Sequence, residues 1–155
     1  MPQYAENTTV SSEKSRAEIE RILARYGADQ FMYGWDSKGA VVQFRADGRH
    51  IRFVLNMPDR QDREITHTPE RGNKRSPAQA EKVYEQAVRQ RWRALALVIK
   101  AKLEAVESGI TEFDAEFLAH IVLPNGQTVG GWMLPQVEQA YLQGEMPPML
   151  GMGDE

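Results

Sequence analysis

Two adjacent residues in the first third of the chain, Asp47 and Gly48, constrain the fold more than any other short stretch. Asp-Gly between alternating apolar segments is typical of a two-residue hairpin loop, because a type I′ turn needs positive φ at both positions. With this loop Ala46 faces Arg49. The opposed pairs are then Phe44 with Ile51, Val42 with Phe53, Ala40 with Leu55 and, from a preceding strand, Trp35 with Ala40. These side chains are apolar and share one face, so a one-residue slip would destroy the match.

A helix and a further strand precede this hairpin. The helix is predicted over residues 12–26, because Ser15 and Glu18 have the spacing of a capping box, with Ser12 as a competing cap. The strand covers residues 31–35, where side chains alternate before a turn. Together with the hairpin it forms a three-stranded antiparallel meander with one apolar face.

The longest predicted element is a helix of about 32 residues, roughly 48 Å long at 1.5 Å per residue. Ser76 is its cap, Pro77 suits its first turn, and Gly109 is its stop signal. Its apolar side chains are spaced by three and four residues: Tyr84, Val88, Trp92, Leu95, Ile99, Leu103 and Val106. Because the helix outruns a three-stranded sheet, we expect a homo-oligomer, most simply a dimer, built partly on this stripe. The segment after residue 110 is the competing cover.

The last third of the chain is predicted to add a hairpin over 120–129 and a short helix over 134–144. The fold class is therefore α+β: helix, three-stranded antiparallel meander, long helix, then C-terminal hairpin and short helix. We divide the chain into a flexible N-terminus at 1–11, an αβββα core at 12–110 with a loop at 58–76, and an acidic segment at 111–155 packed on the core.

Charge is distributed unevenly along the chain, although the total is only −3. Residues 1–59 are neutral, residues 60–102 carry +6, and residues 103–155 carry −9. A basic middle favours a polyanion or an acidic protein surface as partner. The alternative is that the basic middle and the acidic tail neutralise each other, within one chain or between subunits.

Motifs for catalysis and metal binding are missing from the sequence. There is no cysteine, and His50, His67 and His120 have no metal-site spacing, even with Asp59 or Asp62 as further ligands. No glycine-rich phosphate loop follows a strand. We predict no catalytic residue, metal or cofactor, and we favour a non-enzymatic protein over a small enzyme with an unidentified site.

Membrane and export signals are also missing. The longest apolar run is Ala94–Ile99, far short of the roughly 20 residues of a membrane span, and the first residues hold no apolar core typical of a signal peptide. We expect no membrane contact and a location in the cytoplasm.

Candidate phosphate-binding cations come from three parts of the chain. They are Arg45 and Arg52 on the sheet, Lys74 and Arg75 in the loop, and Arg89, Arg93 and Lys100 along one side of the long helix. We predict that they bind nucleic acid or a nucleotide-like polyanion, and that the 60–75 loop becomes ordered on binding. Trp92 is expected in the core, with Arg91 and Arg93 reaching solvent beside it. The alternative function is an anti-defence or other inhibitor protein that binds a host factor through protein contacts.

Two resemblances support the nucleic-acid hypothesis, and a third concerns origin. Over about residues 12–100 the element order resembles the double-stranded-RNA-binding domain, which implies phosphate contacts at Lys74, Arg75 and Lys82. The chain departs from that family in its longer loop and in lacking a Lys-Lys pair at the helix start. The βββα part is also similar to phage single-strand annealing proteins, which form rings on DNA. The runs RQRWRALALVIKAKLEAVESGI and FLAHIVLPNGQTV resemble small uncharacterised proteins of phage and prophage genomes.

Overall fold

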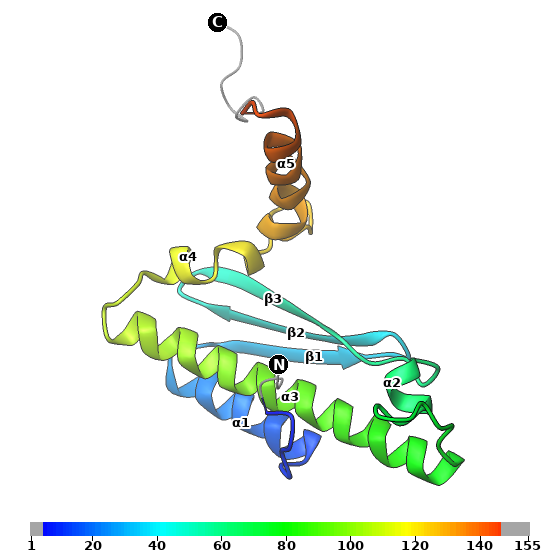
Figure 1. Cartoon of the computed structure of the whole chain (residues 1–155). Coiled ribbons are helices and arrows are strands. Elements are labelled where there is room, and N and C mark those ends of the chain that lie inside the picture. The colour runs from blue at the N-terminus through cyan, green and yellow to red at the C-terminus, as the bar shows by residue number, and fades with distance from the viewer. Residues whose placement is uncertain (1–4, 147–155) are drawn as a thin grey trace, which may run out of the picture.

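Two helices pack against one face of a three-stranded antiparallel sheet (Figure 1). The computed structural model describes residues 5–146. The elements are α1 (Ser12–Arg25), β1 (Gln30–Trp35), β2 (Gly39–Ala46), β3 (Arg49–Asn56), α2 (Arg63–Thr66), α3 (Pro77–Glu107), α4 (Phe113–Glu116), the 3-10 turn η1 (Leu118–His120) and α5 (Val129–Gln143). The predicted α+β class is confirmed.

The sheet has the predicted order and register. Ala46 pairs with Arg49, and each apolar pair expected from the Asp47-Gly48 loop is present, including Trp35 with Ala40. Asp47 and Gly48 both have positive φ, 51° and 72°. The inward side chains of β2 are buried at every second residue, which gives the sheet its single core face.

The bounds of α1 match the predicted 12–26 to within one residue, but its cap does not match the prediction. Ser11 is the cap, and its hydroxyl accepts a hydrogen bond from the Lys14 N–H at 3.2 Å. Ser15 lies inside the helix, fully buried, and its hydroxyl has no hydrogen-bond partner among the described residues. This start puts Ser15 one turn before Ile19 on the core face, so helical burial decides between the competing caps.

Helix α3 has the predicted ends. Ser76 and Gln79 form a capping box, Pro77 occupies the first turn, and the chain leaves the helix through Gly109 at φ +80°. The middle of its apolar stripe is buried: Trp92, Leu95, Ile99 and Leu103.

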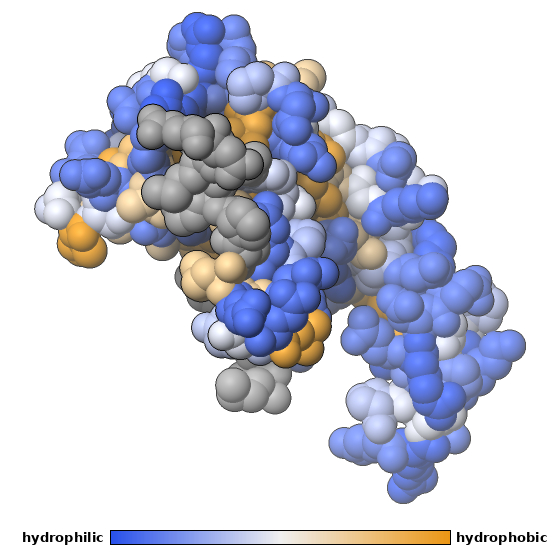
Figure 2. Space-filling model, turned by 90° about the horizontal axis from the view of Figure 1, so that it is seen from above, coloured by the Kyte–Doolittle hydropathy of each residue, from blue (hydrophilic) through white to orange (hydrophobic). Residues whose placement is uncertain are grey.

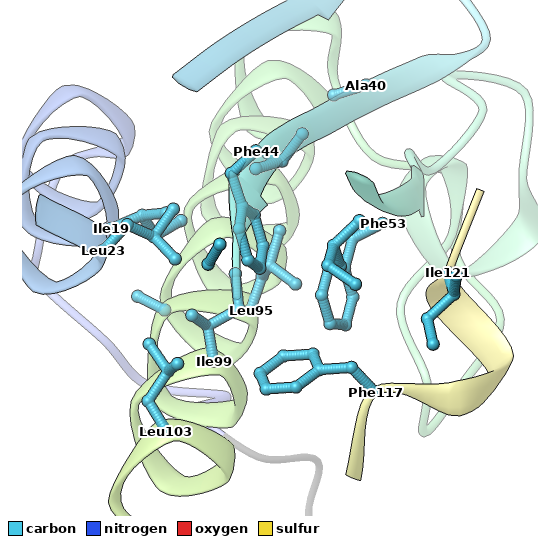
Figure 3. Packing of buried hydrophobic residues seen from close by; sticks show 14 of the residues in the cluster. Ile19, Leu23, Ala40, Phe44, Phe53, Leu95, Ile99, Leu103, Phe117 and Ile121 are labelled. Carbon is cyan, nitrogen blue, oxygen red and sulfur yellow. The ribbon is translucent and has the colours of Figure 1, made fainter. Parts of the chain in front are cut away.

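The segment after α3 covers this stripe within the same chain. Phe117 is fully buried and points between α3 and the sheet toward Ile99 and Phe53 (Figure 3). Its ring lies 4.7 Å from that of Phe113 and meets Phe53 edge-on at 6.3 Å. Of the two covers expected for this stripe, a second subunit or the segment after residue 110, the structure shows the second: a turn of the acidic segment fills the space over the buried part.

The last elements also differ from the prediction. The expected hairpin at 120–129 is reduced to one bridge between Val122 and Thr128, and Ile121 bridges to Ile51 at the edge of β3. Thr128 instead caps α5, which starts five residues earlier than expected. Figure 1 shows α5 projecting away from the sheet and the two long helices.

Two segments predicted as loops are attached to α3. The Gln86 side chain donates to the carbonyls of Glu6 and Thr8, at 3.1 and 2.8 Å, which holds residues 5–10 against the helix. The 58–76 segment contains α2, which packs on α3. None of the helices within residues 5–146 combines the length and apolarity that a bilayer crossing requires.

Candidate functional site

The sheet separates the predicted cations into different surfaces. Arg45 and Arg52 extend from the face opposite α1 and α3 and do not join the cations of α3. Arg45 forms a two-pronged pair with Asp29, with Nε 2.9 Å from Oδ1. The hydrogen bonds between these two side chains hold the pKa of Asp29 below its usual value and raise the pKa of Arg45. Arg52 donates from Nη1 to the Gly126 carbonyl at 2.8 Å. Both side chains therefore have structural partners.

Two of the three predicted cations on α3 are also engaged. Arg89 donates to the Gln86 amide oxygen, with its Nε at 3.2 Å. Arg93 forms a half-buried ion pair with Glu18 that ties α3 to α1. Lys100 is exposed and has no side-chain partner among residues 5–146. The predicted basic line along α3 is thus reduced to one free cation.

Trp92 lies in the core, as predicted, with 2% of its surface exposed. Its two neighbours do not simply reach solvent. Arg91 donates to the Asn56 carbonyl and buries its Nε, and Arg93 is paired as described above. These arginines connect α3 to the end of β3 and to α1, so the Arg-Trp-Arg run stabilises the packing of the helix.

Free cations gather at the other end of α3. We define the basic end as Arg63, Arg71, Lys74 and Lys82, four exposed residues from α2, the following loop and the first turns of α3. None of these side chains makes a hydrogen bond or ion pair within the part of the chain that the structure describes. Figure 2 shows this end of the molecule as almost uniformly hydrophilic.

The loop at the basic end is already closed by its own backbone. The Thr68 N–H donates to the Asn73 carbonyl at 2.8 Å, and the Arg75 N–H donates to the Thr66 carbonyl at 2.7 Å. Gly72, at φ +65°, forms the bend between these strand-like arms. The loop that is predicted to become ordered on binding is thus closed by hydrogen bonds of its own. Arg75 itself turns inward, with Nε 3.3 Å from the His67 carbonyl.

A groove of about 850 Å³ lies between the start of α1, the β1–β2 turn and α3. Arg16 places its guanidinium over two rings, 5.2 Å from Tyr33 and 5.1 Å from Trp92, and Arg60 lies 4.0 Å from the Tyr84 ring. Three basic and three acidic side chains line the groove: Arg16, Lys38, Arg60, Glu13, Asp36 and Asp59. Because these charges balance, the groove does not favour an anion. The groove could not be predicted from the sequence, since its walls come from four separate segments.

The histidines do not form a reactive site. His120 stacks on Phe53 with ring centres 4.0 Å apart. Burial, and next the charge of Lys102, lowers the pKa of His120, so its neutral form packs there. His67 lies beside α2 and His50 is exposed at the start of β3. Within residues 5–146 no three His, Asp or Glu side chains gather in a way that could hold a metal ion.

The basic middle and the acidic tail meet at one ion pair in residues 5–146. Lys102 Nζ lies 3.1 Å from Glu116 Oε1, and Arg49 of the sheet pairs with Asp114 at the same distance. This arrangement supports neutralisation within the chain at the α4 end alone. Among residues 5–146, no acidic segment of the tail pairs with the basic end.

Helix α5 exposes apolar side chains that the sequence analysis expected to be packed. Leu134, Tyr141 and Leu142 are 64%, 87% and 78% exposed, and Val137 is also exposed. The helix touches the rest of the chain at its first turn, where Gly130 approaches Ala119. It carries Glu138 and no basic residue.

Comparison of the chain with models of protein families, with curated proteins and with solved structures found no match.

Proposed function

We propose that this chain is a phage-type, non-enzymatic accessory protein that binds nucleic acid or a nucleotide-like polyanion through its basic end. The observation that carries the proposal is the clustering of exposed, unpartnered cations there: Arg63, Arg71, Lys74 and Lys82. Phosphate binding requires cations that are free of internal carboxylates and accessible to a large ligand.

The arrangement of the helices supports the same surface. In the double-stranded-RNA-binding domain, which the αβββα order resembles, phosphates are contacted from the start of the second helix. Here Lys74 and Lys82 stand at that place with free side chains, whereas Arg75 is turned inward. Glu64 and Glu70 lie in the same segment, so we expect weak binding that depends strongly on salt.

The test is fluorescence anisotropy with labelled single- and double-stranded DNA and RNA at low salt, repeated over a salt series. The double variant Lys74→Gln/Lys82→Gln should weaken binding uniformly and reduce the salt slope by about 2. Lys100→Gln is the matched control, because Lys100 is equally free but lies on the far half of α3. No binding of any form at low salt, or equal losses in the control, would contradict the proposal.

A second candidate function is favoured by the exposed apolar side of α5. Leu134, Val137 and Tyr141 are spaced by three and four residues, as in helices that dock into a partner's groove. Because residues 103–155 carry nine acidic residues and no basic one, the fitting partner is a host protein whose apolar groove has a basic rim. Such contacts would suit an inhibitor or anti-defence protein.

This candidate is tested by affinity capture from host lysate with and without nuclease. Recovery of one stoichiometric protein that resists nuclease and is lost with Leu134→Ser/Tyr141→Ser would favour it. Recovery that disappears with nuclease, or that persists in the double variant, would count against it.

A further inference from the structure

Strand β1 has one edge that no other part of the described chain covers. It pairs with β2 on one side, and no backbone or side-chain group within residues 5–146 bonds its other side. The Asp36 N–H donates to the Gly39 carbonyl at 2.9 Å. Because bonded residues alternate along an antiparallel ladder, Phe31, Tyr33 and Trp35 direct their N–H and C=O groups to the open edge.

This edge lacks the features by which proteins usually protect such strands. The sequence Gln30–Trp35, QFMYGW, has no charged residue and no proline. Three of its large side chains are exposed: Met32 at 59%, Tyr33 at 44% and Trp35 at 75%. An uncharged, apolar, unpaired edge strand is a template for another strand.

We propose that β1 pairs antiparallel with β1 of a second copy of this chain, so that the two sheets become one. The pairing is centred on Tyr33, which faces the same residue of the partner across a twofold axis. Phe31, Tyr33 and Trp35 then form bonded pairs along the junction, with about six backbone hydrogen bonds, two for each pair.

The strand is complementary to itself in this register. On the inner face Phe31 lies opposite the partner's Trp35, an aromatic cross-strand pair. On the outer face Met32 lies opposite the partner's Gly34. No heavy atom lies within 4 Å of where a Cβ on Gly34 would stand, so the partner's methionine has room. A peptide of unrelated sequence would supply the backbone hydrogen bonds. Its side chains would match the large and small side chains of β1 only by chance.

Helix α1 lies beside the same contact. The Arg16–Tyr33 contact places α1 next to β1 on the inner face. Its first turn carries Glu13, which pairs with Arg16 at 3.6 Å, and the exposed Lys14. The twofold axis turns the two α1 helices antiparallel, so the start of each approaches the end of the other. This contact is independent of the basic end and of α5.

Sedimentation equilibrium of the full chain tests the proposal, together with three variants. We expect a dimer at tens of micromolar, which Met32→Ala keeps, since the ladder is made by the backbone. Tyr33→Pro removes one edge-directed N–H while sparing the bonds to β2, and should give a folded monomer by circular dichroism. A dimer that survives Tyr33→Pro but is lost with Leu134→Ser/Tyr141→Ser would overturn the proposal and assign dimerisation to α5.

Cysteine cross-linking tests the register even where the proline variant fails to fold. The chain has no cysteine of its own. Bonded pairs in an antiparallel ladder have Cα atoms about 5.5 Å apart, within the range of a disulfide. Tyr33→Cys alone should cross-link on mild oxidation. Phe31→Cys should cross-link with Trp35→Cys in a mixture but not with itself. A monomeric parent chain at hundreds of micromolar, or cross-linking without this pattern, would overturn the proposal.

Discussion

Helices α3 and α5 both carry apolar side chains at helical spacing, but only α3 buries them. The sheet, α1 and the α4–η1 turn surround α3 on its apolar side, so that Leu95, Ile99 and Leu103 have almost no exposed surface. Helix α5 leaves Leu134, Tyr141 and Leu142 in solvent. The comparison shows that an apolar stripe in a sequence predicts a contact but does not say whether its partner is in the same chain.

The difference in burial between α3 and α5 also predicts which substitutions should lower the stability of the fold and which should not. We call the part of the chain from α1 to η1 the body. The buried residues of the body contact several elements, so their loss should destabilise the whole molecule. Within residues 5–146, the side chains beyond the first turn of α5 have no such contacts, and their loss should leave the stability of the molecule unchanged. The following changes test this division, from the largest expected effect to the smallest.

Phe117→Ala should destabilise the body by about 3–5 kcal/mol, because it opens a cavity between α3 and the sheet. The ring is fully buried and contacts Phe113, Phe44 and Phe53. Tyr141→Ala on α5 is the matched control and should change the free energy of unfolding by less than about 0.5 kcal/mol. Urea denaturation measures both. Equal effects of the two variants would remove the distinction between body and α5.

Gly130→Ala should cost about 1–3 kcal/mol, because its new Cβ would lie 2.9 Å from the Ala119 carbonyl oxygen, a backbone atom. Gly131→Ala is the neighbouring control. There the nearest atom is the Thr128 hydroxyl at 3.2 Å, and alanine favours the helix, so a small effect is expected. Thermal unfolding of both variants tests whether Gly130 is the residue that attaches α5. A neutral Gly130→Ala would show that this attachment is loose.

Acid should weaken the body through His120. Burial lowers its pKa in the folded chain, so the unfolded chain binds the proton more readily. Stability should be complete above the unfolded pKa of about 6.5 and should fall as the pH drops below it. Urea midpoints at pH 8 and pH 5.5 measure the loss. The variant His120→Phe, which keeps a ring against Phe53, should show a smaller difference; an unchanged difference would assign the pH dependence to other groups.

Local signals made most of the sheet and α3 predictable. The Asp47-Gly48 loop and the alternation beside it specify the register, and Ser76-Pro77 with Gly109 specify the ends of α3. The cap of α1 was placed wrongly because Ser11, Ser12 and Ser15 offer competing hydroxyls, and only burial against the core selects among them. The start of α5 was predicted too late, because two adjacent glycines, Gly130 and Gly131, do not favour a helix. Gly130 is needed there for its close approach to Ala119, which the sequence does not show.

The candidate site was less predictable than the fold. Whether a cation is free depends on carboxylates far away in the chain: Glu18 pairs with Arg93, 75 residues later, and Asp29 pairs with Arg45. Within residues 5–146, five of the seven predicted phosphate-binding side chains bond a carboxylate, an amide oxygen or a backbone carbonyl. Lys74 and Lys100 make no such bond there, and they lie on different halves of the molecule. Lys82 was predicted only from the resemblance to the double-stranded-RNA-binding domain. For Arg63 and Arg71, the sequence offered no evidence of phosphate binding beyond their charge.

Native-state hydrogen exchange compares the two regions most directly. Amides of α3 around residues 92–103 should exchange only through global unfolding, because they lie at the centre of the core. Amides of α5 at residues 136–143 should exchange orders of magnitude faster through local opening, since a helix of this length without packing is marginal in water. Slow exchange of α5, equal to that of α3 in the isolated chain, would contradict the division between a packed body and a helix whose apolar side chains lie in solvent.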